Sequence, residues 1–311
     1  MMDFIKYKYF TLTISLAFII AGFAVTYGVH GGFANSLDFN GGIRTTIQFP
    51  ESISRDRLNA YFTEKKIEAV LIQLDKDKNI WQMDMALSVL DEFITKRKIA
   101  KQTEGSALQD FMNQVILDFN LKNGDILSAD QVGAVVGGEL TETGISLIFW
   151  TLIVMAGYLT FRFRFIKFSV GASLALLHDL AITLAMIGAF QIKPSVPLIA
   201  AILTLLGYSI NDTIVIFDRI RENTLNNPDM AMAPVINGSI YQTLGRTINT
   251  SFATLISVVA LIVGGAVELY DFAYVLVFGV IVGTYSSIFI AAPVMEMFDT
   301  FMKNRKKRAT A

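Results

Sequence analysis

The chain has 311 residues, of which 53% are hydrophobic and 17% are charged, and its mean hydropathy is +0.51. This composition excludes an ordinary soluble fold, because so large an apolar excess needs a non-aqueous environment. The net charge of −1 gives no electrostatic argument for a nucleic-acid partner. The chain has no cysteine, which excludes disulfides, thiolate metal sites and cysteine nucleophiles, and His30 and His178 cannot form a multi-histidine metal site unaided.

Six apolar runs are each long enough, or nearly so, to cross a hydrocarbon core of ~30 Å at ~1.5 Å per residue. They cover roughly Tyr9–Val29, Ile145–Phe161, Phe168–Phe190, Val196–Phe217, Arg246–Val267 and Phe272–Val294. The first run is longer than the apolar part of a signal peptide and no A-x-A pattern closes it, which favours an uncleaved anchor.

Lys and Arg are distributed unequally between the short connections. If the N-terminus is cytoplasmic, the cytoplasmic segments carry thirteen of these residues, and the two short outer loops carry one, Lys193. Because basic loops stay inside, both termini are expected in the cytoplasm. The basic tail, 295–311, either binds anionic lipid headgroups or acts only as a topological stop.

The polar segment 31–144, between the first and second spans, is expected to fold by itself outside the membrane. Residues 43–49 alternate apolar and polar side chains, as a half-buried strand does, and Ser54 is placed to cap a helix over 55–66. Strands over 68–75 and 80–87, a helix over about 105–120 and a strand near 125–135 complete a β-α-β-β-α-β order. That order predicts a small ferredoxin-like α+β domain.

Glycines lie near both ends of this segment. Gly41 and Gly42 precede the first strand, and Gly137 and Gly138 precede the second span. Since no G-x-x-x-x-G-K-[ST] pattern occurs, turns and close backbone contacts are favoured over a phosphate-binding loop. The expected organisation is therefore 1–30 for the cytoplasmic N-terminus and first span, 31–144 for the outer domain, 145–294 for spans two to six, and 295–311 for the tail.

Ionisable side chains within the spans point to function, since each costs ~2.5–3.5 kcal/mol to insert at the centre of a span. Asp212 lies on the fourth run, one turn after Tyr208, and Arg246 opens the fifth run at a similar depth. One interpretation is a fixed ion pair that joins two helices. The other is a carboxylate that switches between protonated and charged states, as in proton pumps.

Four polar residues, Tyr208, His178, Asp179 and Asn211, are auxiliary candidates. His178 and Asp179 are adjacent on the third run and form either a helix contact or part of a proton path, and Asn211 precedes Asp212.

Gly279 and Gly283 in the sixth run have the spacing that permits close helix packing.

The segment GYSINDTIVIFDRIREN, residues 207–223, resembles the hallmark segment of the SecF family. Further similar segments follow the family's order along the chain. They are LDFNGG (37–42), VGAVVGGEL (132–140), LLHD (176–179), RTINTS (246–251) and GTYSSIFIAAP (283–293). Ser36 and Ala134 depart from the usual glycine and proline of these motifs.

The resemblance implies a fold, a function and partners. It implies a polytopic inner-membrane protein of six transmembrane helices with a periplasmic α+β domain, similar to half of a resistance-nodulation-division transporter. Such a subunit pairs with SecD, works beside the SecYEG channel, and uses the proton motive force to assist late, outer-side steps of preprotein export. It is no enzyme and has no cofactor, and protons are the coupling ion. By motif, Asp212 and Arg246 correspond to the positions linked to proton conduction, and the glycine-rich segments could act as hinges.

Two other functional classes stay open. A half-size proton-coupled exporter of small molecules has the same membrane architecture, although such exporters usually carry about twelve spans and a larger outer domain. A passive scaffold of the Sec machinery is the second alternative, and it predicts that neutral substitutions at Asp212 are silent.

Overall fold

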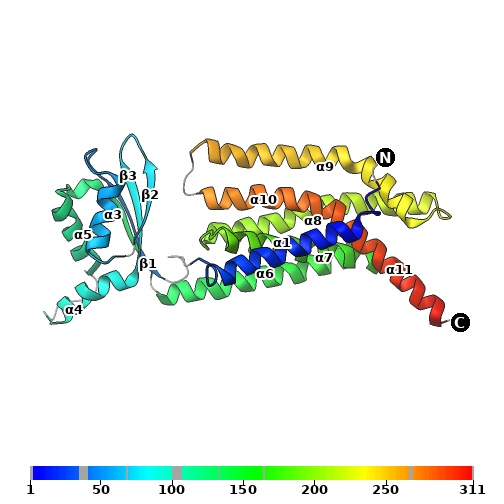
Figure 1. Ribbon diagram of the computed structural model, residues 1–311, viewed down its shortest axis with the longest axis horizontal. Helices are drawn as coiled ribbons and strands as arrows, with labels where there is room; N and C mark the ends of the chain where they lie inside the picture. Colours follow the sequence, from blue (N-terminus) through cyan, green and yellow to red (C-terminus); the bar gives the residue numbers. More distant parts are fainter. Residues whose placement is uncertain are drawn as a thin grey trace. The chain divides into compact units, whose positions relative to one another are not determined.

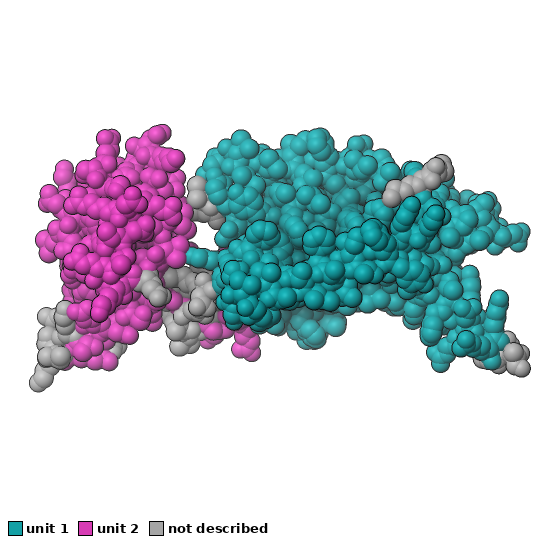
Figure 2. Space-filling model, viewed as in Figure 1, with its two compact units in different colours: residues 1–34, 145–193, 197–311 teal, residues 35–144, 194–196 magenta. Residues whose placement is uncertain are grey.

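The computed structural model describes residues 3–34, 41–67, 69–99, 107–132, 134–163, 165–265 and 269–309. The chain divides into two compact units, which Figure 2 shows in different colours. Residues 1–34, 145–193 and 197–311 form the first, here called the helical unit, and residues 35–144 with 194–196 form the second, here called the α+β unit.

Within the part of the chain that the structure describes, six helices are long and apolar enough to cross a membrane, which confirms the six-span architecture. Figure 1 labels their helical segments. They are α1 (Lys8–Gly28), α6 (Ala134–Arg162), α7 (Ile166–Ala189), α8 (Val196–Asn226), α9 (Met232–Val263), and a last stretch made of α10 (Tyr270–Ser286), the π-helical turn η5 (Ser287–Ala291) and α11 (Ala292–Ala309).

Three helices extend well beyond the apolar runs that predict them. Helix α6 begins at Ala134, α8 continues to Asn226, and α9 begins at Met232 instead of near Arg246. Hydropathy marks only the stretch that matches the hydrocarbon thickness, whereas backbone hydrogen bonding continues a helix into polar residues.

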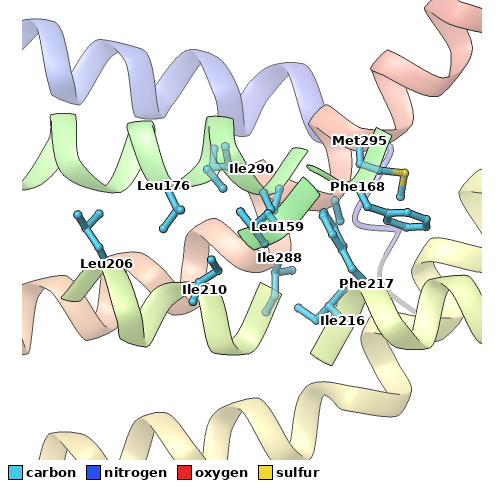
Figure 3. Packing of buried hydrophobic residues seen from close by; sticks show 14 of the residues in the cluster. Leu159, Phe168, Leu176, Leu206, Ile210, Ile216, Phe217, Ile288, Ile290 and Met295 are labelled. Atoms are coloured by element: carbon cyan, nitrogen blue, oxygen red, sulfur yellow. The ribbon is translucent and has the colours of Figure 1, made fainter. Parts of the chain in front are cut away.

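The helical unit has one continuous apolar core. Figure 3 shows Phe168 of α7, Phe217 of α8 and Leu159 of α6 close to one another, and the ring centroids of Phe168 and Phe217 are 5.3 Å apart. All three side chains are buried. Helix α1 packs along α7, where Gly22 lies against Ala185 and Gly188 lies against Thr26.

Both chain ends and the connection between α8 and α9 lie at one end of the helical unit (Figure 1). Side chains tie these segments together there, because the amine of Lys8 contacts Glu296 at 2.6 Å and the amide of Asn237 donates to Asp3 at 2.7 Å. The bond from Asn237 lowers the pKa of Asp3 below its usual value. The segments expected on one side of the membrane are thus brought to one end of this unit.

The α+β unit contains a four-stranded sheet with helices packed against it. Its elements in chain order are β1 (Gly42–Gln48), α3 (Arg55–Glu64), β2 (Ala69–Asp75), β3 (Ile80–Ala86), the 3₁₀ turn η1 (Leu87–Leu90), α4 (Asp91–Ile99), α5 (Ala107–Phe119), the 3₁₀ turn η3 (Asn123–Asp125) and β4 (Ile126–Val132). The strand order is β2-β3-β1-β4 and each described pairing is antiparallel. This is the split β-α-β arrangement of ferredoxin-like domains, as predicted.

The core of this unit follows the alternation of its strands. Ile43 and Ile47 of β1 and Met83 of β3 are fully buried against Leu58 of α3. The Ser54 hydroxyl accepts a hydrogen bond from the Arg57 backbone N–H at 3.4 Å and so caps α3 as expected.

Among the described residues of this unit, α4 is the α-helix that the sequence does not predict. Its composition is polar, and its contact with α5 includes the rings of Phe93 and Phe111, whose centroids are 5.8 Å apart. With so few apolar residues, no amphipathic period stands out.

Candidate functional site

Asp212 lies in the interior of α8 and is only 3% exposed. Its Oδ1 accepts a hydrogen bond from the Thr250 hydroxyl of α9 at 3.4 Å, while its Oδ2 is buried and has no hydrogen-bond partner among the described residues. The Thr250 hydroxyl has one hydrogen and also lies 3.0 Å from the Thr247 carbonyl. Thr250 therefore shares its hydrogen between Asp212 and a backbone carbonyl. A buried charged carboxylate would need several hydrogen-bond donors of its own.

Arg246 occupies the same face of α9 one turn before Thr250, but its side chain is exposed. Among the described residues, no ion pair within 4 Å joins it to Asp212, so the fixed ion pair, one of the two interpretations, is not formed in this conformation. Arg246 acts on the carboxylate at longer range. The long side chain of Arg246 leaves the guanidinium free to reach the helix surface, whereas the shorter Thr250 fits between α8 and α9.

Three hydroxyl groups form a chain beside Asp212. Tyr208 of α8 donates to Ser251 of α9 at 3.0 Å, and the Ser251 and Thr284 oxygens are 2.6 Å apart. Thr284, on α10, in turn donates to the Val280 carbonyl at 2.7 Å. The chain thus links three spans. Sequence reasoning named Tyr208 but not Ser251 or Thr284, since hydroxyl residues are unremarkable in an apolar helix.

Asp179 and His178 belong to a second buried cluster. Asp179 is fully buried, its Oδ1 lies 2.9 Å from His178 Nδ1, and its Oδ2 accepts a hydrogen bond from the Ser209 hydroxyl of α8. Ser209 precedes Asp212 by three residues, so both clusters share α8. Asn211 belongs to neither, because its side chain is exposed and makes no hydrogen bond to a described residue.

The π-helical turn η5 interrupts the last span next to these clusters. Pro293 has no N–H to donate to the Phe289 carbonyl, which instead accepts from the Thr11 hydroxyl of α1 at 3.3 Å. Ser287, the first residue of the turn, contacts the Thr213 hydroxyl of α8 at 3.0 Å. Pro293 in the printed sequence is the signal that could have predicted this irregularity.

The remaining candidates lie outside these clusters. Gly41 has a φ of +76°, which glycine adopts most readily, and Gly42 begins β1. Gly137 and Gly138 lie within α6 and not in a turn. The motif residues 37–40 and Gly133 lie outside the described residues. Gly279 and Gly283 pack closely against Leu205 and Ser209, as their spacing predicts.

Among the described residues, no group of three or more His, Asp or Glu side chains could hold a metal ion. What the two clusters offer chemically is a set of buried carboxyl, imidazole and hydroxyl groups that can accept, hold and donate protons.

Comparisons with known proteins place these features in a family. Residues 114–300 match the family described as protein export membrane protein SecD/SecF, C-terminal. The protein translocase subunit SecF of Sebaldella termitidis is 33% identical over 95% of this chain and 93% of its own length. SecF of Thermodesulfovibrio yellowstonii is 34% identical over 94% of this chain and 93% of its own length.

A fused relative extends the comparison to structure. The chain is 32% identical to 38% of the protein translocase subunit SecDF of Thermus thermophilus, with 96% of this chain covered. The crystal structure of SecDF from Thermus thermophilus, described as a translocon-associated membrane protein, matches 96% of this chain and 39% of its own chain with a TM-score of 0.78 and 29% identity. The six spans, the α+β unit and these matches together show that the chain belongs to the SecF family of protein translocase subunits.

Proposed function

We propose that this chain is the proton-coupled half of a SecDF complex, which uses the proton motive force to assist the late, outer-side steps of preprotein export through SecYEG. It is an accessory transport subunit and not an enzyme, and its coupling ion is the proton. The fused SecDF relative supports SecD as its partner. In this proposal the α+β unit lies in the periplasm of a bacterial inner membrane and contacts the emerging preprotein, with Gly41, Gly42, Gly137 and Gly138 as hinges.

The charge distribution supports that orientation. Basic residues are concentrated in the connections expected in the cytoplasm, and the described part of the tail continues as α11, with Lys303, Arg305 and Lys307 near its end. These side chains suit contact with anionic lipid headgroups.

One observation carries the coupling role: Asp212 is buried within a span, and its Oδ2 has no partner among the described residues. A proton crossing 100 mV releases about 2.3 kcal/mol, enough to bias a conformational equilibrium of a few kcal/mol. Arg246, exposed on the neighbouring helix, supplies a charge that can approach Asp212 when the carboxyl loses its proton.

Neutral substitutions of the two residues test the coupling role. Asp212→Asn should leave assembly with SecD intact and abolish the stimulation of export by the proton gradient. Arg246→Met should cause a comparable loss, and the double variant should be little worse than either, since both residues act on one step. Asp218→Asn on the same helix is the matched control, because Asp218 pairs with Arg162 and lies outside both clusters.

A purely structural contact predicts another pattern. If the two residues only held α8 and α9 together, each single substitution would reduce the level of assembled complex, and the double variant would be assembled at least as well as either single variant. Full gradient-driven export by well-assembled Asp212→Asn complexes would contradict the coupling role and support the scaffold alternative.

A further inference from the structure

The hydroxyl chain next to Asp212 has a defined direction. The Thr284 hydroxyl donates its single hydrogen to the Val280 carbonyl at 2.7 Å. In the hydrogen bond between Ser251 and Thr284, Ser251 must therefore be the donor. Tyr208 then donates to Ser251. None of these three hydrogens is donated to Asp212, and Ser251 has no hydrogen left for the carboxyl that its hydroxyl faces.

This arrangement fits a protonated, neutral Asp212. A neutral carboxyl carries its own hydrogen and tolerates one unpartnered oxygen better than a carboxylate does. Once the proton leaves, the buried carboxylate needs a donor besides Thr250, and Ser251, which is only 6% exposed, has the other hydroxyl that faces it. Ser251 can donate to Asp212 only by giving up its bond to Thr284.

We infer that Ser251 is a positioning residue that exchanges hydrogen-bond partners, donating to Thr284 when Asp212 is protonated and to Asp212 when Asp212 is charged. This inference rests on the proposed function. It couples the protonation state of Asp212 to the hydrogen bond between Ser251 of α9 and Thr284 of α10. Loss of the 2.6 Å contact between Ser251 and Thr284 frees α10 from α9 at the depth of the carboxyl.

The titratable and charged groups around Asp212 allow this exchange. Arg246 faces it from α9, and Tyr208 lies one turn away on α8. Asp179 of α7 is engaged with His178 of the same helix and with Ser209 of α8. Among the described neighbours, the hydroxyls of Thr250 and Ser251 are therefore the donors that face the carboxyl.

Two substitutions shift the exchange in opposite directions. Thr284→Val keeps the shape of the side chain but removes the competing acceptor, so Ser251 always donates to Asp212 and favours its charged form. Ser251→Ala removes the donor and favours the neutral form. Thr284→Ser keeps a hydroxyl and is the conservative control.

The experiment uses the complex with SecD in lipid vesicles. The infrared carbonyl band of protonated Asp212, identified as the band that Asp212→Asn complexes lack, is followed against pH. The midpoint of its disappearance should move by about one pH unit to lower pH in Thr284→Val and by about one unit to higher pH in Ser251→Ala, the scale of one hydrogen bond to a charged group. Thr284→Ser should match the parent complex.

Opposite shifts separate a partner exchange from a structural role, because loss of packing alone would lower the level of assembled complex in both variants without moving the midpoint. Three results would overturn the inference. The midpoint could stay unchanged, it could move in the same direction in both variants, or the band could fail to titrate at all. Gradient-driven export by the Asp212→Asn complex is measured in parallel. If gradient-driven export persists in the Asp212→Asn complex, the proposed function is wrong. If that export is lost but the midpoints of the other variants do not shift, only the partner exchange by Ser251 is wrong.

Discussion

Close packing of α1 on α7 makes Gly188 a position where one methyl group should be costly. A Cβ added there would lie 2.3 Å from the Thr26 hydroxyl oxygen and 2.6 Å from its methyl carbon. Thr26 cannot move aside easily, because it is fully buried, β-branched, and donates to the Gly22 carbonyl at 2.8 Å. We therefore expect Gly188→Ala to force the two helices apart.

The magnitude follows from a matched control. Gly157 on α6 has nothing within 4 Å of the same added Cβ, so Gly157→Ala should only gain the higher helix propensity of alanine, about 0.5–1 kcal/mol. Gly188→Ala makes the same gain but also overpacks a tight contact, which typically costs about 1–3 kcal/mol. The free energies of unfolding of the two variants should therefore differ by about 1–3 kcal/mol.

The assay is reversible unfolding in mixed micelles, with helical circular dichroism followed as the fraction of denaturing detergent rises. Thr26→Ala removes both close atoms, so the double variant with Gly188→Ala should recover part of the loss, with a coupling energy of at least about 0.5 kcal/mol. Equal stability of Gly188→Ala and Gly157→Ala, or no coupling with Thr26, would refute the packing of α1 on α7 described above.

Three further predictions concern both units. Burial and the hydrogen bond to Asp118 raise the pKa of Tyr61, so the contribution of Tyr61 to stability is present below about pH 10 and is lost as the pH rises above it. The urea midpoint of the α+β unit should therefore fall as the pH rises above about 10, and Tyr61→Phe should reduce this fall. Leu58→Ala, in the fully buried core of the same unit, should cost about 2–5 kcal/mol of unfolding free energy, and a loss below about 1 kcal/mol would mean that the site is not packed as described. Reporter fusions at Asn227 should be cytoplasmic and those at Lys193 external; an external Asn227 would contradict the orientation.

Hydropathy and strand alternation predict most of the fold because each follows directly from which side chains must be kept out of water. An apolar run of the right length must be covered by lipid, and the period-2 pattern at Ile43 and Ile47 can be satisfied only by a strand with one buried face. The helix ends at Ala134 and Asn226 could not be predicted in this way, because polar helical residues outside the hydrocarbon core give neither a long apolar run nor an alternating pattern.

The candidate site is predictable only in part. Asp212 stands out because burying a carboxyl within a span is costly. Its neighbours Ser251 and Thr284 depend on the rotation and depth of α9 and α10 relative to α8, which one sequence does not specify. The distance between Asp212 and Arg246 likewise depends on the side-chain conformation of Arg246, which the sequence alone does not determine.

The most direct test of the central claim is the effect of a protonophore on preprotein release by assembled complexes of this chain with SecD. In the parent complex, collapse of the gradient should slow the late release step to the rate of the Asp212→Asn complex. In the Asp212→Asn complex the protonophore should have no further effect on that step, because the carboxyl through which the gradient acts is already absent. Release by Asp212→Asn complexes that still falls to the same extent when the gradient is collapsed would contradict the claim that Asp212 couples proton movement to export.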